Sequence, residues 1–337
     1  MTCKQCLLLT AALLTATLQQ AGAQTAADTF RELCRTEAQG SGIAVAGKDG
    51  WYFLKSELRF LGAGDFWGEN AQRTSRSANP KTKDPLAAIT AYQKALEAEN
   101  IELLLVPIPP KAVIYPDMLP ASTLKAARYD ASLQRFYDVL RKEGVNVIDL
   151  TPTLMNARKN STEPLYCKGD SHFSSYGCKV VAEAIAQVMK KNYGLEGTQS
   201  YAVEKNTATI CGDLYKAAKG TAPKDETLTL YTVTGAGTKS KDSPVLMLGD
   251  SHTLVFDVGS DLFATGAGLP SLLAASAGMP VDVMGVRGSG ATPARINVYR
   301  RSKSDKNFLK KKKLFIWCFS AREFTEASGW NANVPVK

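Results

Sequence analysis

The stretch Pro244-Val-Leu-Met-Leu-Gly-Asp-Ser-His-Thr253 decides the fold and directs attention to one serine. Four apolar residues, Val245 to Leu248, are bounded by a proline and a glycine, which is typical of a buried strand. Ser251 closely follows that strand, and α/β folds place reactive groups just past the carboxyl ends of their strands. The same position also suits a helix N-cap, so this stretch alone leaves the role of Ser251 open.

The tetrapeptide Gly-Asp-Ser-His occurs a second time, at residues 169–172, and the only two histidines of the chain end these two segments. A serine hydroxyl becomes a nucleophile when a base accepts its proton and a carboxylate orients that base. We assign Ser251 as the nucleophile because it directly follows a strand. We assign His172 as the base and Asp170 as the orienting carboxylate, since the two lie close together in a loop before a predicted helix.

Two alternatives remain open at this point. The roles could be exchanged, with Ser171 as nucleophile, His252 as base and Asp250 as carboxylate. Both tetrapeptides could also be ordinary polar loops.

Strand and helix patterns alternate over most of the chain, which predicts an α/β fold with a largely parallel sheet flanked by helices. Apolar runs predict strands at residues 101–108, 145–150, 245–248, 280–284 and 314–319. Apolar residues at helical spacing predict helices at residues 85–100 and 129–143, and a further helix is expected after Ser174-Ser-Tyr-Gly177, reaching Lys191. The segment at about 193–242 is rich in Thr, Gly and Lys, and it predicts a β-rich insertion.

The first 23 residues have the features of a secretory signal peptide. Lys4 precedes an apolar stretch from Leu7 to Leu18, and Ala21-Gly-Ala23 fits a cleavage site. We therefore expect a protein exported to the periplasm, with a single domain over residues 24–337. No later segment approaches the length of a membrane-spanning helix, so we expect no transmembrane segment in the mature chain.

The chain carries a net charge of +9, from 41 Lys and Arg residues against 32 Asp and Glu residues. Such a surface can attract an anionic polymer, nucleic acid or membrane headgroups, or it can serve solubility alone. For an exported protein an acidic polysaccharide is favoured, and we expect no nucleic-acid partner. The loop Gly285-Val-Arg-Gly-Ser-Gly290 lacks both the G-x-G-x-x-G pattern and a P-loop lysine, so we expect no nucleotide cofactor.

Five cysteines follow the predicted signal peptide, and an oxidising compartment favours disulfides. Cys167 and Cys178 bracket the first tetrapeptide, so we predict a disulfide between them and a second one between Cys34 and Cys211. Cys318 lies in an apolar strand and would be a free, buried thiol. With two histidines and no C-x-x-C pair after the predicted signal peptide, we expect no metal site.

Acyl transfer through a serine also needs hydrogen-bond donors for the oxyanion. The backbone N–H of Ser251 is one candidate, and the loop after residues 280–284 could bring Gly288 or Gly290 close to it. Arg322, at the end of the last predicted strand, could bind a substrate group or form a structural ion pair. Lys111, at the tip of the 101–108 strand, is a further candidate substrate contact, or simply an exposed lysine.

The order of these motifs resembles the AlgJ/AlgX family of polysaccharide O-acetyltransferases. The matching segments are Gly50-Trp-Tyr-Phe-Leu54, Pro107 to Pro116 around Lys111, Asp170-Ser-His-Phe173, Leu248-Gly-Asp-Ser-His252 and Trp317-Cys-Phe-Ser-Ala-Arg322. The resemblance implies an SGNH-hydrolase-like fold with a permuted topology, in which Asp-x-His precedes the serine segment. It also implies the triad roles of Asp170, His172 and Ser251.

The resemblance further implies acetyl transfer to an exopolysaccharide, alginate-like or cellulose-like, through an acetyl-serine intermediate in the periplasm. The acetyl group would come from a membrane-bound O-acyltransferase partner. A carbohydrate acetylesterase of the SGNH type would use the same three residues with water as the acceptor. A non-catalytic polysaccharide-binding or secretion-scaffold protein would need none of them.

Overall fold

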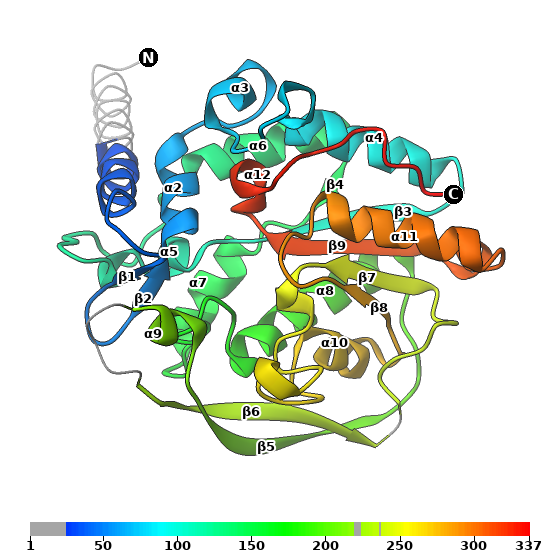
Figure 1. Ribbon diagram of the computed structural model, residues 1–337. Coiled ribbons are helices and arrows are strands. Elements are labelled where there is room, and N and C mark those ends of the chain that lie inside the picture. Colours follow the sequence, from blue (N-terminus) through cyan, green and yellow to red (C-terminus); the bar gives the residue numbers. More distant parts are fainter. Residues whose placement is uncertain (1–24, 219–223, 236) are drawn as a thin grey trace, which may run out of the picture.

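A five-stranded parallel sheet carries the Ser251 segment just past the carboxyl end of an inner strand, β7 (Figure 1). Its strands lie in the order β4-β3-β9-β7-β8, and every neighbouring pair is parallel. Their bounds are Glu102–Ile108 for β3, Asn146–Val147 for β4, Val245–Gly249 for β7, Asp282–Gly285 for β8 and Leu314–Ser320 for β9. The carboxyl ends of all five strands therefore meet on one side of the sheet, as the sequence predicts for an α/β fold.

The computed structural model describes residues 25–218, 224–235 and 237–337. The predicted signal peptide, residues 1–23, lies outside the described residues. All five strands predicted for the sheet are present, but β4 is shorter than the predicted strand at 145–150. Among the described residues, none of the helices has the length and apolar character needed to span a bilayer.

Helices cover both faces of the sheet. One face packs on α4 (Pro85–Glu97), α6 (Ala131–Lys142) and α11 (Thr292–Ser304), and the other on α7 (Thr151–Asn160), α8 (Ser175–Tyr193) and α10 (Leu269–Ala277). Alternate residues of a strand face opposite sides, so Leu248 and Trp317 join the first layer while Met247 and Ile316 join the second. Figure 1 shows α4 and α6 above the strands and α8 and α10 below them.

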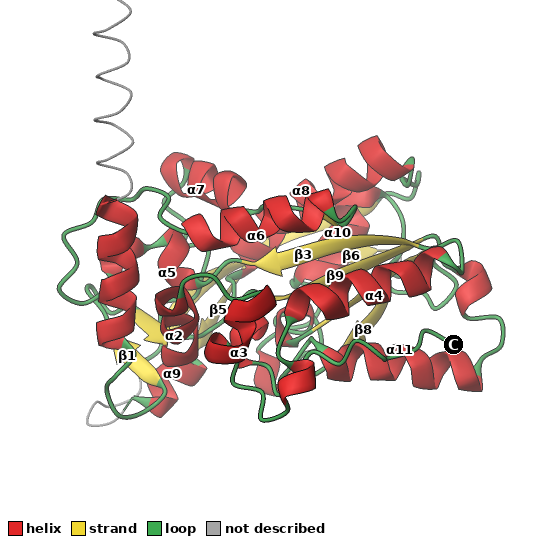
Figure 2. Ribbon diagram, turned by 90° about the horizontal axis from the view of Figure 1, so that it is seen from above, coloured by secondary structure: helices red, strands yellow, loops and turns green. Residues whose placement is uncertain are grey.

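Shorter elements lie around this framework. The remaining helices are one at residues 25–37, α2 (Lys55–Ala63), α3 (Ala71–Thr74), α5 (Lys111–Ile114), α9 (Asp213–Ala217) and α12 (Glu323–Glu326). Short 3₁₀ turns occur at Gly68–Asn70, Pro80–Thr82, Pro116–Met118, Ser251–Thr253 (η4), Ser260–Leu262 and Leu309–Lys311. Figure 2 shows α2, α5 and α9 gathered at the end to which the arrow of β3 points, which is the side where the strands end.

Two antiparallel pairs of strands stand apart from the main sheet. Strands β1 (Ala44–Ala46) and β2 (Tyr52–Leu54) form one pair. Strands β5 (Tyr201–Ile210) and β6 (Glu226–Gly235) form a long ribbon within the 193–242 segment, and β6 packs beneath α8 and α10 (Figure 1).

Capping residues explain where the helices around the site begin and end. Asp84 accepts a hydrogen bond from the N–H of Leu86 at 3.0 Å, with Pro85 at the first helical position of α4. Ser174 accepts one from the N–H of Gly177 at 3.0 Å at the start of α8, and Gly194 ends that helix in the left-handed conformation with φ 63°. The predicted helix at 85–100 is confirmed as α4, which ends at Glu97, and the predicted helix that reaches Lys191 is confirmed as α8.

Both predicted disulfides are wrong, because all five described cysteines are free thiols. Cys34 and Cys178 lie in the main core under the sheet, Cys167 lies in a smaller core beside the β5–β6 ribbon, and Cys211 packs at α9. Each predicted pair is thus divided between different hydrophobic clusters. Cys318 is free and buried, as predicted, and burial raises the pKa of the Cys178 thiol to about 12.

Candidate active site

Ser251 stands at the first position of η4, immediately past the end of β7. The strand ends at Gly249, where a Cβ atom would lie 1.7 Å from the carbonyl oxygen of Cys318, so only glycine allows this approach of β7 to β9. Asp250, and not Ser251, is the capping residue, since its side chain accepts from the N–H of His252 at 3.0 Å. The hydroxyl of Ser251 is therefore free to bond elsewhere.

Ser251, His172 and Asp170 form a continuous row of hydrogen bonds. The Oγ of Ser251 lies 2.7 Å from Nε2 of His172, and Nδ1 of His172 lies 2.6 Å from Oδ1 of Asp170. When Nδ1 donates its proton to the carboxylate, Nε2 is left as an acceptor for the serine hydroxyl. This is the arrangement that activates a serine for attack on an acyl group.

The environment of Asp170 favours its charged form. Its oxygens accept from the backbone N–H of His172 at 3.1 Å and of Asp213 at 2.8 Å, in addition to the imidazole. Burial opposes ionisation, but the hydrogen bond and charge of His172, with these N–H donors, bring the pKa of Asp170 to about 2. The carboxylate is thus ionised at any ordinary pH.

The same pair makes His172 more basic than an isolated histidine. Burial tends to lower the pKa of His172, but the hydrogen bond and charge of Asp170 outweigh it, and the charges of Asp213 and Asp250 act in the same direction. The net effect raises the pKa of His172 above its usual value. The side chain of His172, in the middle of the row, remains 12% exposed.

The exchanged arrangement of Ser171, His252 and Asp250 is not formed. The Oγ of Ser171 donates to Oδ2 of Asp213 at 2.6 Å, while Nε2 of His252 has no hydrogen-bond partner among the described residues. His252 is only 1% exposed, its Nδ1 lies 3.3 Å from Asp250, and burial lowers its pKa. The geometry thus brings together the three residues of the first assignment, whereas in the second only His252 and Asp250 meet and Ser171 bonds elsewhere.

Lys111 is buried, which differs from both the predicted substrate contact and an exposed lysine. It is 1% exposed, and its ammonium donates to the carbonyl oxygens of Tyr52 at 2.8 Å, Cys167 at 2.7 Å and Asp170 at 2.6 Å. These acceptors lie in β2 and in the loop that carries Asp170 and His172. Lys111 therefore cannot reach a substrate, and it fixes the loop instead.

Arg322, the residue before α12, faces α2. Its Nη1 is 3.8 Å from Oε1 of Glu57, and its side chain is 17% exposed. Burial tends to raise the pKa of the Asp250 carboxyl group, but its contact with His252 and the charge of Arg322 bring that pKa to about 2. The ion pair that the sequence left as an alternative is therefore formed.

The two candidate oxyanion glycines lie in different surroundings. Gly290 is buried directly against Asp250, because a Cβ on Gly290 would lie 2.8 Å from the backbone nitrogen of Asp250. Gly288 is exposed, with φ 99° and no atom within 4 Å of such a Cβ. Only Gly290 therefore lies beside the turn that carries Ser251.

The loop after β8 is held in place by two further residues. The hydroxyl of Ser289 donates to the carboxylate of Glu323, and the indole N–H of Trp317 donates to the carbonyl oxygen of Gly290 at 2.8 Å. Burial raises the pKa of Glu323 to about 7. These contacts fix the segment next to Asp250.

Asp213 is the site residue that the sequence analysis missed. Its carboxylate accepts from the N–H and Oγ of Ser171 at 2.8 and 2.6 Å, and its own N–H supports Asp170. Asp170, His172 and Asp213 together offer possible metal ligands within 4.8 Å of one another. Their ligand atoms already share hydrogen bonds with protein groups, so this cluster is suited to orienting the imidazole. No local pattern marks Asp213, which lies in the β-rich segment.

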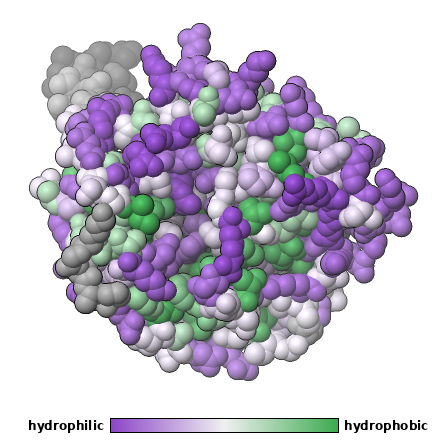
Figure 3. Space-filling view, in the orientation of Figure 1, coloured by the Kyte–Doolittle hydropathy of each residue, from purple (hydrophilic) through white to green (hydrophobic). Residues whose placement is uncertain are grey.

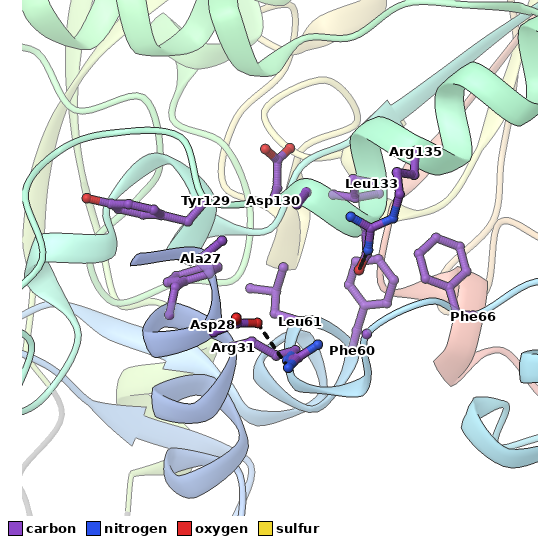
Figure 4. Close-up of a pocket in the computed structure, with 14 residues that line it drawn as sticks. Ala27, Asp28, Arg31, Phe60, Leu61, Phe66, Tyr129, Asp130, Leu133 and Arg135 are labelled. Atoms are coloured by element: carbon purple, nitrogen blue, oxygen red, sulfur yellow. Dashed lines mark hydrogen bonds and ion pairs between the residues drawn. The ribbon is translucent and has the colours of Figure 1, made fainter. Parts of the chain in front are cut away.

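A separate pocket lies between the helix at 25–37, α2 and α6 (Figure 4). Phe60, Phe66 and Leu133 contribute to its wall, together with the arginines Arg31 and Arg135. Its volume of about 50 Å³ has room for a few water molecules only. The pocket is too small for a sugar, and none of the three residues of the row lines it.

Comparison with protein families gives one match to most of the chain. The family described as "SGNH hydrolase-like domain, acetyltransferase AlgX" matches residues 44–321. The probable alginate O-acetylase AlgJ of Pseudomonas aeruginosa is 26% identical over 158 residues, which are 47% of this chain and 36% of that protein. AlgJ of Pseudomonas syringae pv. tomato is 26% identical over 179 residues, 52% of this chain and 41% of the relative. The chain thus matches about two fifths of the length of these curated relatives.

Solved structures show the same fold. The O-acetyltransferase domain of Pseudomonas putida AlgJ superposes with a TM-score of 0.64 and 20% identity, covering 85% of this chain and 93% of that one. AlgX of Pseudomonas aeruginosa gives a TM-score of 0.60 at 16% identity, covering 85% of this chain and 65% of that one. The predicted fold, a parallel SGNH-hydrolase-like sheet flanked by helices, is confirmed.

Proposed function

The chain belongs to the family of SGNH hydrolase-like domains of acetyltransferase AlgX, and we propose from this premise that it transfers acetyl groups to an exopolysaccharide through an acetyl-serine on Ser251. The observation that carries the proposal is the row from Ser251 through His172 to Asp170, with distances of 2.7 and 2.6 Å. A serine hydroxyl, a basic imidazole and an ionised carboxylate in this order are the parts of a two-step acyl transfer.

In the first step His172 accepts the proton of Ser251 at Nε2 while Oγ attacks the acetyl carbonyl carbon of the donor. The tetrahedral intermediate collapses, the donor's leaving group takes the proton from His172, and the acetyl-serine remains. The backbone N–H of Ser251 has no intrahelical acceptor at the first position of η4, so it is available to the oxyanion. The backbone of Gly290 is the second candidate, because it lies against Asp250.

In the second step a sugar hydroxyl replaces the donor. His172 takes its proton, the alkoxide oxygen attacks the acetyl-serine, and the proton returns from His172 to Oγ of Ser251 as the acetyl ester leaves. Asp170 stabilises the imidazolium that forms in both steps. Lys111 and Asp213 are positioning residues, because they hold the loop that carries Asp170 and His172.

We further propose an alginate-like or cellulose-like polymer as acceptor and a membrane-bound O-acyltransferase as the partner that supplies the acetyl group. The polymer is supported by the curated relatives, which are described as probable alginate O-acetylases. Acetylation of an exported polymer agrees with the predicted signal peptide and with action in the periplasm. Oligosaccharides of both polymers are therefore the acceptors to test.

The test is to incubate the protein with an activated acetyl ester and oligosaccharide acceptors, and to detect acetylated oligosaccharides by mass spectrometry. We expect acetylated product with the parent chain and none with Ser251→Ala. Cleavage of the ester without any acetylated oligosaccharide would indicate that the protein is an esterase and not a transferase. Equal product from the parent and Ser251→Ala would contradict the proposed intermediate.

A further inference from the structure

A cleft of about 690 Å³ lies beside α12 and is lined by four arginines, which we call the arginine cleft. Arg35 comes from the helix at 25–37, Arg59 from α2, Arg73 from α3 and Arg76 from the segment after α3. The other lining residues are Ala38, Gln39, Gly62, Ala63, Thr74, Ser75, Thr325 and Glu326. Mainly hydrophilic side chains cover the upper part of the face in Figure 3, where α2 and α3 lie in Figure 1.

Acidic side chains neutralise only part of this charge. Arg59 pairs with Glu326, the single acidic residue of the lining, and Arg35 pairs with Glu32 at 2.9 Å. Arg73 donates to the neutral side chain of Asn70 at 2.6 Å. The guanidinium of Arg76 has no hydrogen-bond or ionic partner in the part of the chain that the structure describes. Arg73 and Arg76 therefore offer two positive charges to a ligand.

The segment at residues 70–83, which carries Arg73 and Arg76, contains positive charges only. Residues 70–83 contain two arginines and two lysines but no aspartate or glutamate. Arg73 and Arg76 are exposed, so their charges are not needed for packing. A solvated surface normally mixes both signs of charge, and a field of one sign attracts the opposite charge.

Two ion pairs connect the cleft with the candidate active site. Helix α2 contributes Glu57 and Arg59, which pair with Arg322 and Glu326 on either end of α12. Arg322 precedes Glu326 by about one helical turn, and its charge acts on Asp250, next to Ser251. Glu326, which lines the cleft, thus lies about one helical turn from Arg322, whose charge acts on Asp250 beside the nucleophile.

The lining indicates which kind of anion fits. Its volume lies in the range of ordinary ligand sites, and Gln39, Thr74 and Ser75 add neutral hydrogen-bonding groups between the arginines. None of its described lining residues is aromatic, whereas single-stranded nucleic acid is held by stacking on aromatic side chains. Planar guanidinium groups match carboxylates, and the neutral groups match hydroxyls.

We propose that the arginine cleft binds the carboxylates of an acidic polysaccharide, a uronate polymer, and holds it next to Ser251 as the acetyl acceptor. This inference rests on the proposed acetyl transfer and selects the acidic polymer over the neutral glucan. Sugars of the chain beyond the acetylated one occupy the cleft, and Arg73 and Arg76 bind their carboxylates.

The test uses Arg73→Gln/Arg76→Gln, with Arg300→Gln/Lys303→Gln as the matched control. The control removes two exposed positive charges from α11, which does not line the cleft. Binding of a uronate hexasaccharide and of a neutral cellohexaose is measured by calorimetry in the Ser251→Ala background, so that no chemistry is needed. Thermal unfolding of each variant checks that the fold is kept.

We expect the uronate to bind better than the glucan, and the cleft variant to lose about tenfold or more in affinity while the control keeps it. Uronate binding should also weaken as salt rises. Equal binding of the two oligosaccharides, equal losses in cleft and control variants, or competition by inorganic phosphate at the same concentration as the uronate would overturn the inference. If the parent transfers no acetyl group, the proposed function is contradicted. The binding measurement does not depend on acetyl transfer, so the two failures can be told apart.

Discussion

The two Gly-Asp-Ser-His segments have the same local structure and different surroundings. In each, the aspartate accepts from the N–H of the histidine two residues later, at 3.1 Å for Asp170 and 3.0 Å for Asp250. In each, the same carboxylate oxygen faces Nδ1 of that histidine, at 2.6 and 3.3 Å. Yet the two segments contribute different residues to the candidate site: the first contributes its histidine, His172, and the second its serine, Ser251.

The difference arises from what the fold places next to each segment. His172 lies at the surface of the site and meets Ser251, while His252 is buried behind that serine with its ring centre 4.8 Å from that of His172. Ser171 is occupied by Asp213. A repeated motif therefore fixes a repeated turn, and the sheet decides which side chain of the turn is available for chemistry.

Replacing the serine of each segment by alanine should show the largest difference between the two segments. Ser251→Ala should lower the rate of acetyl release from an activated ester by roughly 10⁴-fold or more, because no other described hydroxyl bonds to Nε2 of His172. Ser171→Ala should keep the rate within about tenfold, since the Oγ of Ser171 bonds to Asp213 at 2.6 Å and lies 3.5 Å from Nδ1 of His172, away from the Nε2 that faces Ser251. Steady-state kinetics of both variants check this, and a reversed ranking would exchange the roles of the two segments.

Removing the charge of the first aspartate should cost nearly as much. Asp170→Asn should reduce kcat by about 10⁴-fold, because an amide favours the wrong tautomer of His172. Asp250→Asn should cost less, because Asp250 faces His252 and not His172, although the single amide oxygen can accept from only one of the two N–H groups, of His252 and Ser320, that bond to different oxygens of the carboxylate. The comparison fails if Asp250→Asn proves the slower enzyme while both variants stay folded.

The pH dependence should separate the two histidines. Neutral His172 is the active base, and its pKa is raised, so kcat/KM should rise with pH through a limb above about 6.5. Asp170→Asn should move this limb to lower pH, because burial of His172 then acts without the opposing carboxylate. His252→Gln should leave the limb near the parent position, and a large shift of the limb in that variant would assign the base to His252.

The second histidine should matter mainly for stability. His252→Gln keeps a donor for Asp250 but changes a buried shape, so we expect the free energy of unfolding to fall by about 1 to 2 kcal/mol. Activity of the folded variant should remain within about tenfold. Chemical denaturation with parallel kinetics measures both effects, and an inactive but fully stable variant would argue for a role in the chemistry.

The smallest effect should come from the cysteines around the first segment. Cys167 and Cys178 are free thiols, so any loss of stability in Cys167→Ser/Cys178→Ser should be the same under oxidising and reducing conditions. A reducing agent should likewise leave the unfolding midpoint of the parent unchanged. Peptide mapping without reduction should find unlinked thiols. A crosslink between the two would mean that the first segment is tied down by a bond that the second lacks.

The sequence predicted those features that depend on neighbouring residues. The apolar run at Val245 located β7, and the polar residues after it located the turn of Ser251. Asp170 and His172 were found because two residues apart in a loop can share a hydrogen bond. The ion pair of Arg322 was left open, since a strand end shows that a side chain is near the site but not what it faces.

Features that depend on distant contacts were missed. Lys111 bonds to carbonyl oxygens of β2 and of the Asp170 loop, so its burial follows from three segments meeting in space. Asp213 supports Asp170 across more than forty residues of chain, and no pattern marks it. The cysteine pairs failed for the same reason, because spacing along the chain does not tell which hydrophobic cluster each thiol enters.

Mapping the trapped acetyl group tests the central claim most directly. The protein is mixed with an activated acetyl ester without acceptor, quenched in acid within the first turnovers, digested and examined by tandem mass spectrometry. The account predicts one acetyl group on the peptide of the second segment, at Ser251, and none in the His172→Gln variant. An acetyl group on Ser171 or on another residue of the parent chain would contradict it.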